Sequence, residues 1–160
     1  MPSTNFLEKY HMAFGLNPLA DAFSGTVSSD VVNMKNFDEV TFLIFWGVGT
    51  TGTTTITVEA CDDVTPTNTT AIPFRYRNVT GAINAGDTHG AITAATTSGV
   101  LTTAGSHQVY AVSVRAEELG DTGYGYVRCT CVEGTDSPIL GGILILQGHP
   151  RFDVDDTTLA

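Results

Sequence analysis

The side chains that could act as metal ligands are scattered along the chain. The four histidines lie far apart and show neither the i, i+2 spacing nor the His-Glu-x-x-His spacing of a metal site; they are His11, His89, His107 and His149. A zinc site would need several of them to converge with a cysteine or a carboxylate. We therefore expect solvated loop histidines and no metal or other cofactor.

Two clusters of aspartates offer the hard oxygen ligands that calcium prefers. The first is Asp62 with Asp63, and the second comprises Asp153, Asp155 and Asp156 near the C-terminus. Neither cluster has the spacing of an EF-hand loop, and short acidic runs are usually solvated charge. We expect no calcium site, and these two clusters are where an overlooked ion would bind.

No catalytic constellation is present in the sequence. No serine lies in the Gly-x-Ser-x-Gly frame of a nucleophile elbow. The adjacent acids Glu117 and Glu118 point to opposite sides of an extended chain, so they cannot form an acid/base pair. The sequence predicts that the protein is not an enzyme.

The three cysteines do not form a disulfide framework. Cys129 and Cys131 are two residues apart on a predicted strand, so they share a face and cannot easily bond to each other. A bond from Cys61 to either of them stays an alternative. We expect buried free thiols that behave as small hydrophobic groups, and assembly in a reducing cytoplasm.

Composition and charge exclude two classes of partner. The chain has 160 residues, with 7 basic against 17 acidic side chains and a net charge of −10. Nucleic-acid binding requires clustered Lys and Arg, and the nearest approach to a basic patch is Arg75 with Arg77. We expect no membrane partner either, because no run approaches the roughly 18 apolar residues that span a bilayer and the N-terminus lacks the pattern of a signal peptide.

Period-two alternation of apolar residues dominates from Val40 to Leu146 and predicts an all-β protein. About eight strands are expected, drawn from residues 26–34, 39–48, 53–61, 72–79, 108–115, 124–132 and 138–147 together with short possible strands near 91–95 and 100–103. The strand in residues 39–48 is apolar on both faces, so it is predicted to be central or covered. We predict a single-domain, jelly-roll-like β-sandwich in residues 25–150. An immunoglobulin-like sandwich is the alternative, although Trp46 precedes every cysteine.

Residues 1–24 are predicted to form an N-terminal arm, and residues 151–160 an acidic C-terminal tail. Asn5 could cap a short helix from Phe6 to Phe14, and Pro18 would end any longer one. The arm either folds back over one sheet or passes to a neighbouring subunit. Its apolar residues are the candidate contacts between subunits or with a larger assembly: Phe6, Tyr10, Phe14, Leu16, Leu19 and Phe23.

Three stretches carry a resemblance to a known class of proteins. They are ITVEACDDVTP (residues 56–66), GYGYVRCTCVEGTDSPILGGILIL (123–146) and HPRF (149–152). They resemble small structural proteins encoded in the head-gene clusters of tailed bacteriophages, and the chain looks like a capsid decoration, or cement, protein. That resemblance implies an all-β virion protein on the capsid exterior, bound to the major capsid protein and self-associating as a homotrimer.

The acidic composition agrees with an outside location, because a negative protein avoids packaged DNA. Two alternatives remain. A receptor- or carbohydrate-binding module of a phage fibre should expose aromatic residues from its loops, whereas the loops here carry Thr, Gly and Asp. A neck or tail component would share both the fold class and the setting.

Overall fold

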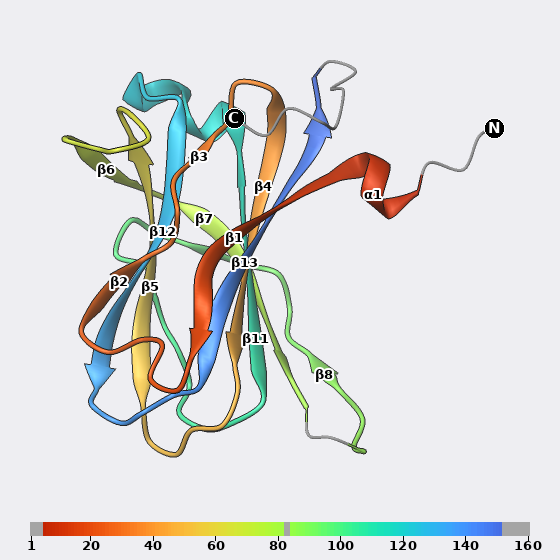
Figure 1. The fold of residues 1–160 in the computed structure, drawn as a ribbon, viewed down its shortest axis with the longest axis vertical. Coiled ribbons are helices and arrows are strands. Elements are labelled where there is room, and N and C mark those ends of the chain that lie inside the picture. The colour runs from red at the N-terminus through yellow and green to blue at the C-terminus, as the bar shows by residue number, and fades with distance from the viewer. Residues whose placement is uncertain (1–4, 82–83, 152–160) are drawn as a thin grey trace.

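Strands form wherever β-branched and aromatic residues alternate with smaller or polar ones. The computed structural model describes residues 5–81 and 84–151, and their strands build two antiparallel sheets that pack face to face (Figure 1). The protein is therefore a single-domain all-β sandwich, as the sequence predicts.

The first sheet has the order β1-β13-β4-β11-β7-β8, with β9 also paired to β7. Its strands are β1 (Tyr10–Leu19), β13 (Gly141–Pro150), β4 (Phe37–Trp46), β11 (Gln108–Arg115), β7 (Phe74–Thr80), β8 (Thr88–His89) and β9 (Thr93–Ala95).

The second sheet has the order β10-β5-β12-β2, with β3 on β12 and β6 on β5. Its strands are β10 (Val100–Leu101), β5 (Thr53–Cys61), β12 (Tyr126–Thr135), β2 (Thr26–Ser28), β3 (Val32–Asn33) and β6 (Thr69–Ile72). Two short helices complete the fold, α1 (Phe6–Lys9) and the 3₁₀ helix η1 (Ala116–Thr122).

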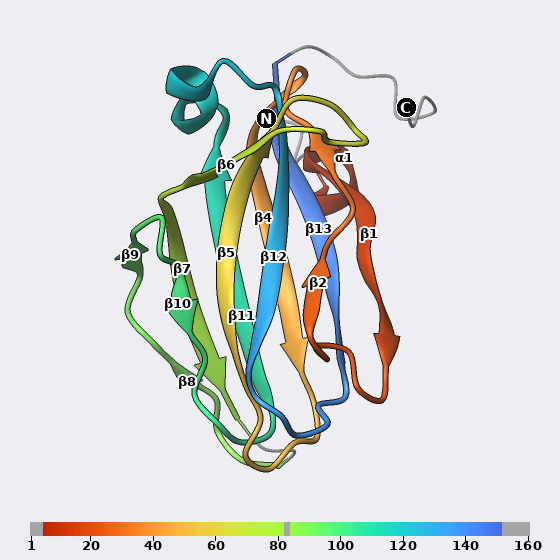
Figure 2. The ribbon, with the colours of Figure 1, turned by 90° about the vertical axis from the view of Figure 1, so that its left-hand side faces the viewer.

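Strand pairing is nested in the manner of a jelly roll. The first half of the chain pairs with the second half in reverse order: β1 with β13, β2 with β12, β4 with β11, and β5 with β6. Successive pairs alternate between the two sheets, so a single long antiparallel ribbon wraps into a sandwich (Figure 2). The predicted jelly-roll topology is confirmed, and the immunoglobulin-like alternative does not fit this nesting.

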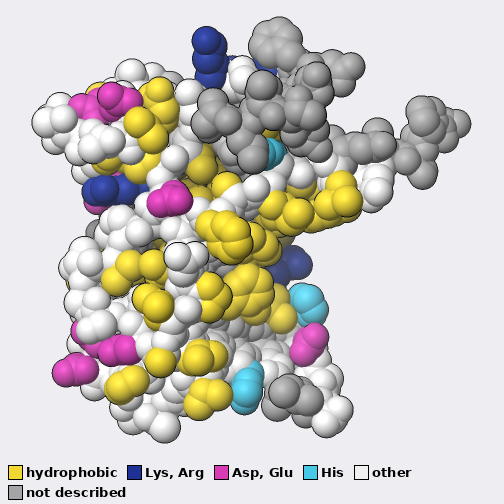
Figure 3. All heavy atoms as spheres, viewed as in Figure 1, with side chains coloured by type: hydrophobic (Ala, Val, Ile, Leu, Met, Phe, Trp, Pro, Cys, Tyr) yellow, Lys and Arg dark blue, Asp and Glu magenta, His cyan; other side chains and the backbone are white. Residues whose placement is uncertain are grey.

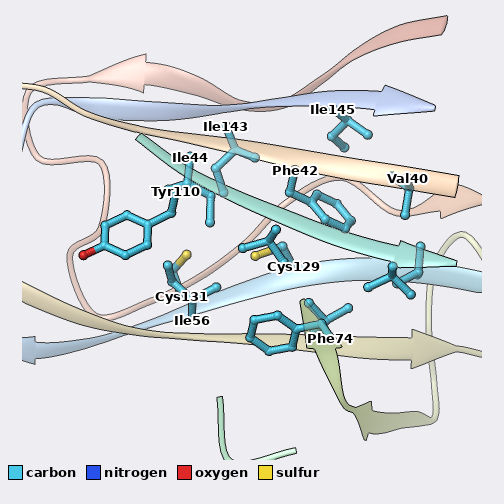
Figure 4. Close-up of a cluster of buried hydrophobic side chains, with 14 of the residues drawn as sticks. Val40, Phe42, Ile44, Ile56, Phe74, Tyr110, Cys129, Cys131, Ile143 and Ile145 are labelled. Carbon is cyan, nitrogen blue, oxygen red and sulfur yellow. The ribbon is translucent and has the colours of Figure 1, made fainter. Parts of the chain in front are cut away.

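The core lies between the sheets and is built from the inward residues of each strand. Figure 4 shows side chains of both sheets pointing toward one another, with Phe42 and Ile145 from the first sheet and Ile56 and Cys129 from the second. Strand β4 lies in the middle of the first sheet, and its inward residues from Val40 to Trp46 are at most 1% exposed. The predicted central position of this strand is confirmed.

The structure corrects the predicted arm. The helix ends at Lys9, and Tyr10–Leu19 form the edge strand β1 of the first sheet, paired with β13. The arm is therefore folded onto its own subunit, and the sandwich begins near residue 10 instead of residue 25. Of the predicted acidic tail, residues 152–160 lie outside the described residues.

The cysteines are free and buried, as predicted. Cys129 and Cys131 lie on one face of β12 and point into the core. A hydrogen bond with Cys131, together with burial, raises the pKa of the Cys129 thiol. Burial also raises the pKa of Cys61 to about 11, so both thiols stay protonated at neutral pH.

Candidate functional site: the apolar face

The outer face of the first sheet is apolar where solvent would favour polar side chains. Antiparallel register places Phe14, Leu144, Leu43 and Ala111 in one row across four strands. The neighbouring rows add further apolar residues. We call the set the apolar face, and its members are Met12, Phe14, Leu43, Phe45, Val79, Val109, Ala111, Leu144 and Leu146.

These side chains are accessible in the monomer. Phe14 is 70% exposed, Met12 47% and Phe45 44%. Figure 3 shows hydrophobic side chains gathered along α1 and β1, where the apolar face reaches the margin of the sheet. Scattered exposed hydrophobic residues need no explanation, but a contiguous patch marks an interaction site.

The outer face of the second sheet is built differently. Strand β5 presents Thr53, Thr55 and Thr57 there, and Ser28 and Thr130 share a hydroxyl hydrogen bond of 3.0 Å. An ion pair there joins Arg128 Nε to Glu59 Oε2 at 2.8 Å, with both side chains about one-quarter exposed. Leu101 and Val132 add two exposed apolar side chains beside Thr55, but hydroxyl groups and a paired charge predominate, so this outer face is more polar than that of the first sheet.

One margin of the apolar face is basic. Register with β11 places Arg75 beside Ser113 and Arg77 beside Ala111, so both arginines lie on the outward side of β7. Within the part of the chain that the structure describes, neither guanidinium pairs with a carboxylate. The Nε of Arg77 is also buried without a hydrogen-bond partner there.

A hollow of about 420 Å³ at one end of the first sheet is charged but internally paired. Its lining residues are Asp38, Glu39, Arg115, Glu117, His149 and Arg151. Arg151 pairs with Asp38, Arg115 with Glu117 at 3.4 Å, and His149 Nε2 lies 3.6 Å from Glu39 Oε2. Ser113 Oγ also donates to Glu39 at 2.9 Å. Since each basic group already has an acidic partner, the hollow offers no surplus charge to a ligand.

A smaller hollow of about 290 Å³ continues the apolar face toward the opposite end of the sheet. Phe45, Val79 and Val109 line it together with Gly47 and Gln108. It offers chiefly hydrophobic contact, so we treat it as part of the apolar face.

The titratable residues remain apart in three dimensions. Among the described residues, no three His, Cys, Asp or Glu side chains are grouped as metal ligands. Asp62 instead organises its own loop, because its carboxylate accepts hydrogen bonds from Asn68 Nδ2 at 2.8 Å and from the backbone of Thr67 and Asn68. The Asn68 side chain is the main cause of its lowered pKa. The Asp153–Asp156 cluster lies outside the described residues.

The six predicted contact residues divide into two groups. Phe6 stacks on the Tyr10 ring at 4.9 Å and Tyr10 lies over Gly148, while Phe14 lies farther along β1 and is 70% exposed. Leu19 is 52% exposed at the end of β1, and Leu16 packs partly against the core. Phe23 is a correction: it is 2% exposed and stacks on Trp46 at 4.7 Å, so it belongs to the core.

Sequence reasoning identified Leu43 and Phe45 as a second apolar face of their strand but did not connect them with Met12, Phe14, Leu144 and Leu146. The missing signal was strand register, which brings residues from opposite ends of the chain side by side. No family model, curated protein or solved structure matches this chain. None of the helices in the described residues is long and apolar enough to cross a membrane.

Proposed function

We propose that this protein is a non-catalytic structural component of a bacteriophage virion that decorates and stabilises the outer surface of the capsid. In this proposal the apolar face binds the shell formed by the major capsid protein. The observation that carries it is the contrast between the two outer faces, because only one of them resembles a surface that is covered in its working state. The phage setting comes from the sequence resemblance.

The size of the apolar face suits a protein contact. Five strands about 4.8 Å apart and about five residues long cover roughly 24 by 17 Å, or about 400 Å² in flat projection. Such a patch is comparable to the largest apolar patches of ordinary monomers, about 300–600 Å², which are often functional. Neighbouring apolar side chains at Phe6, Leu19 and Leu140 enlarge the surface that a partner could bury.

The distribution of charge also supports a subunit that binds the shell through its apolar face. The net charge is −10, yet the centre of the apolar face carries no charged side chain. Arg75 and Arg77 lie along its β7 margin, and Asp87 lies at the smaller hollow. A subunit that binds through this face would keep most of its acidic side chains on the solvent side. Acidic exteriors favour solubility and repel nucleic acid.

The exposed aromatic residues favour this proposal over a carbohydrate-binding module. Phe6, Phe14 and Phe45 lie in α1, β1 and β4 instead of in loops. Sugar-binding aromatics on a β-sandwich would be expected at the loop ends, where they can surround a ligand. A neck or tail component would use an apolar face equally well, so location in the particle separates that alternative.

The test uses variants of the apolar face in a shell-binding assay. Leu43→Thr combined with Phe45→Thr introduces β-branched side chains, which favour strands, while removing apolar area from β4. We expect unchanged far-UV circular dichroism and at least a tenfold loss of co-sedimentation with capsid shells that lack the protein. The matched control, Thr55→Ser with Thr57→Ser on the second sheet, should bind normally. Undiminished binding by the β4 variant would refute the proposed face.

A further inference from the structure

Strand β1 is an unusually open sheet edge. The strands at the other sheet edges of the described residues, β2, β3, β6, β8, β9 and β10, have only two to four residues each. Short edge strands are one way in which proteins prevent unwanted pairing. β1 has ten residues, pairs with β13 on one side, and lies at the margin of the molecule (Figure 2).

The open part of this edge is the segment Tyr10–Phe14. Its register with β13 is regular from Tyr10 to Phe14 and shifts only after Phe14. Beyond that point the Gly15 carbonyl accepts a hydrogen bond from the backbone N–H of Asp30 at 2.9 Å, so the edge is already partly covered there. Between Tyr10 and Phe14 there is no Pro, Lys or bulge to prevent another strand from pairing.

We propose that two copies of this protein pair through β1, antiparallel and around a two-fold axis at Met12. In this register Tyr10 lies opposite Phe14 of the second copy, and His11 lies opposite Ala13. The side chains that point to the outer face are Tyr10, Met12 and Phe14, so the contact brings two aromatic pairs and a central Met–Met pair together. Aromatic cross-strand pairs stabilise antiparallel sheets, and a two-fold contact requires such self-complementarity.

Charge complementarity supports a second copy as the occupant. Lys9 ends α1 directly before the paired segment, so the same two-fold axis brings it to the end of the contact where Gly15 of the second copy lies. The Gly15 carbonyl there accepts a hydrogen bond from the backbone N–H of Asp30 of that copy. Lys9 and Asp30 are both exposed, and neither has an ion-pair partner among the described residues. Two-fold symmetry therefore creates two Lys9–Asp30 pairs, one at each end of the contact. No other charged residue lies between Lys9 and Asp21, so two chains of net charge −10 can approach here.

Pairing through β1 also joins the two apolar faces. Met12 and Phe14 form the β1 margin of each face, so the paired strands would make one continuous sheet with an apolar surface spanning both subunits. This deepens the proposed function by naming a partner for the arm residues. It also gives a two-fold contact where the sequence resemblance implies a trimer.

Cross-linking tests the position of the axis. Opposed Cα atoms of antiparallel strands are about 4.5–5.5 Å apart, within the range that a disulfide can bridge. Met12→Cys should form a covalent dimer on mild oxidation, whereas Leu43→Cys in the middle of the apolar face should not. The native thiols give a low background because all three are buried. Cross-linking of Leu43→Cys in place of Met12→Cys would show face-to-face stacking and would overturn the proposal.

Charge reversal tests the register independently. Analytical ultracentrifugation of the full chain should show a reversible dimer, weakened about tenfold by Lys9→Glu or by Asp30→Lys. The combined variant should regain the original affinity, and Lys35→Glu should serve as a silent control. Three results would each contradict the β1 pairing: a monomer at concentrations up to about 100 micromolar, a trimer, or a combined variant that does not regain the original affinity. Shell binding by a monomeric variant would leave the proposed function standing, which separates the two failures.

Discussion

Burial controls the chemistry of the cysteines at the level of single residues. Cys129 and Cys131 lie where sequence alternation predicts buried positions, and the raised pKa of Cys61 follows from loss of solvation. Alternation predicts burial well because it depends only on which face of a strand a residue occupies. Alternation alone places Cys61 on the outward side of β5, and its burial is expected only from the usual behaviour of free thiols.

We predict that the native protein reacts slowly with a thiol reagent at pH 8 and rapidly once unfolded. With a pKa of about 11, roughly one Cys61 thiol in a thousand is ionised at pH 8. The folded state binds the proton more tightly than the unfolded state, so this contribution to stability is complete below about pH 9 and is lost as the pH rises toward 11. The rate of reaction with a chromogenic disulfide, measured with and without denaturant, tests the predicted protection of the thiols. Fast labelling of all three thiols in the native protein would contradict the predicted protection.

Two phenylalanines from the predicted arm should behave in opposite ways. Phe23→Ala removes a fully buried ring from the stack on Trp46 and should lower the free energy of unfolding by about 3–5 kcal/mol. Phe14→Ala removes a ring that is 70% exposed and should change monomer stability by less than about 0.5 kcal/mol. Urea denaturation measures both. Equal losses of unfolding free energy would show that Phe23 and Phe14 have been wrongly assigned to core and surface.

At the scale of elements, β1 is the part that sequence reasoning misassigned. Tyr10, Met12 and Phe14 do alternate with smaller residues, but their apolar side faces outward, opposite to the usual pattern of a half-buried strand. A bulge near Gly15 then interrupts the period, and a Cβ at this glycine would lie 2.8 Å from an Ile143 carbon. The sequence has a polar capping residue at Asn5 followed by apolar residues, and this pattern predicts a helix as far as Phe14. The helix ends at Lys9.

Two truncations distinguish the contributions of α1 and β1 to the stability of the fold. Deleting residues 1–9 should leave the melting temperature nearly unchanged, because α1 has few contacts with the sandwich and projects away from it in Figure 1. Deleting residues 1–19 should lower the melting temperature sharply and promote aggregation, since it leaves the long strand β13 as a bare edge. Circular dichroism melts compare the two. A stable 1–19 deletion would mean that β1 is dispensable for the fold.

At the scale of the whole molecule, the fold could be predicted and the working surface only partly. The sandwich class and the central two-faced strand follow from local alternation, which the sequence contains. The apolar face depends on pairing β1 near the N-terminus with β13 near the C-terminus, more than 100 residues apart. Local patterns carry no information on that register. The asymmetry between the two outer faces therefore becomes evident only in three dimensions.

The most direct test of the proposed function is a cryo-electron microscopy map of phage particles purified from an infection in which this protein is expressed. We expect density for the sandwich on the outer surface of the shell, with Leu43 and Phe45 turned toward the major capsid protein and the threonine-lined sheet turned toward solvent. Absence of the protein from the shell, its presence only at the neck, tail or fibre, or an apolar face turned toward solvent would contradict the proposal.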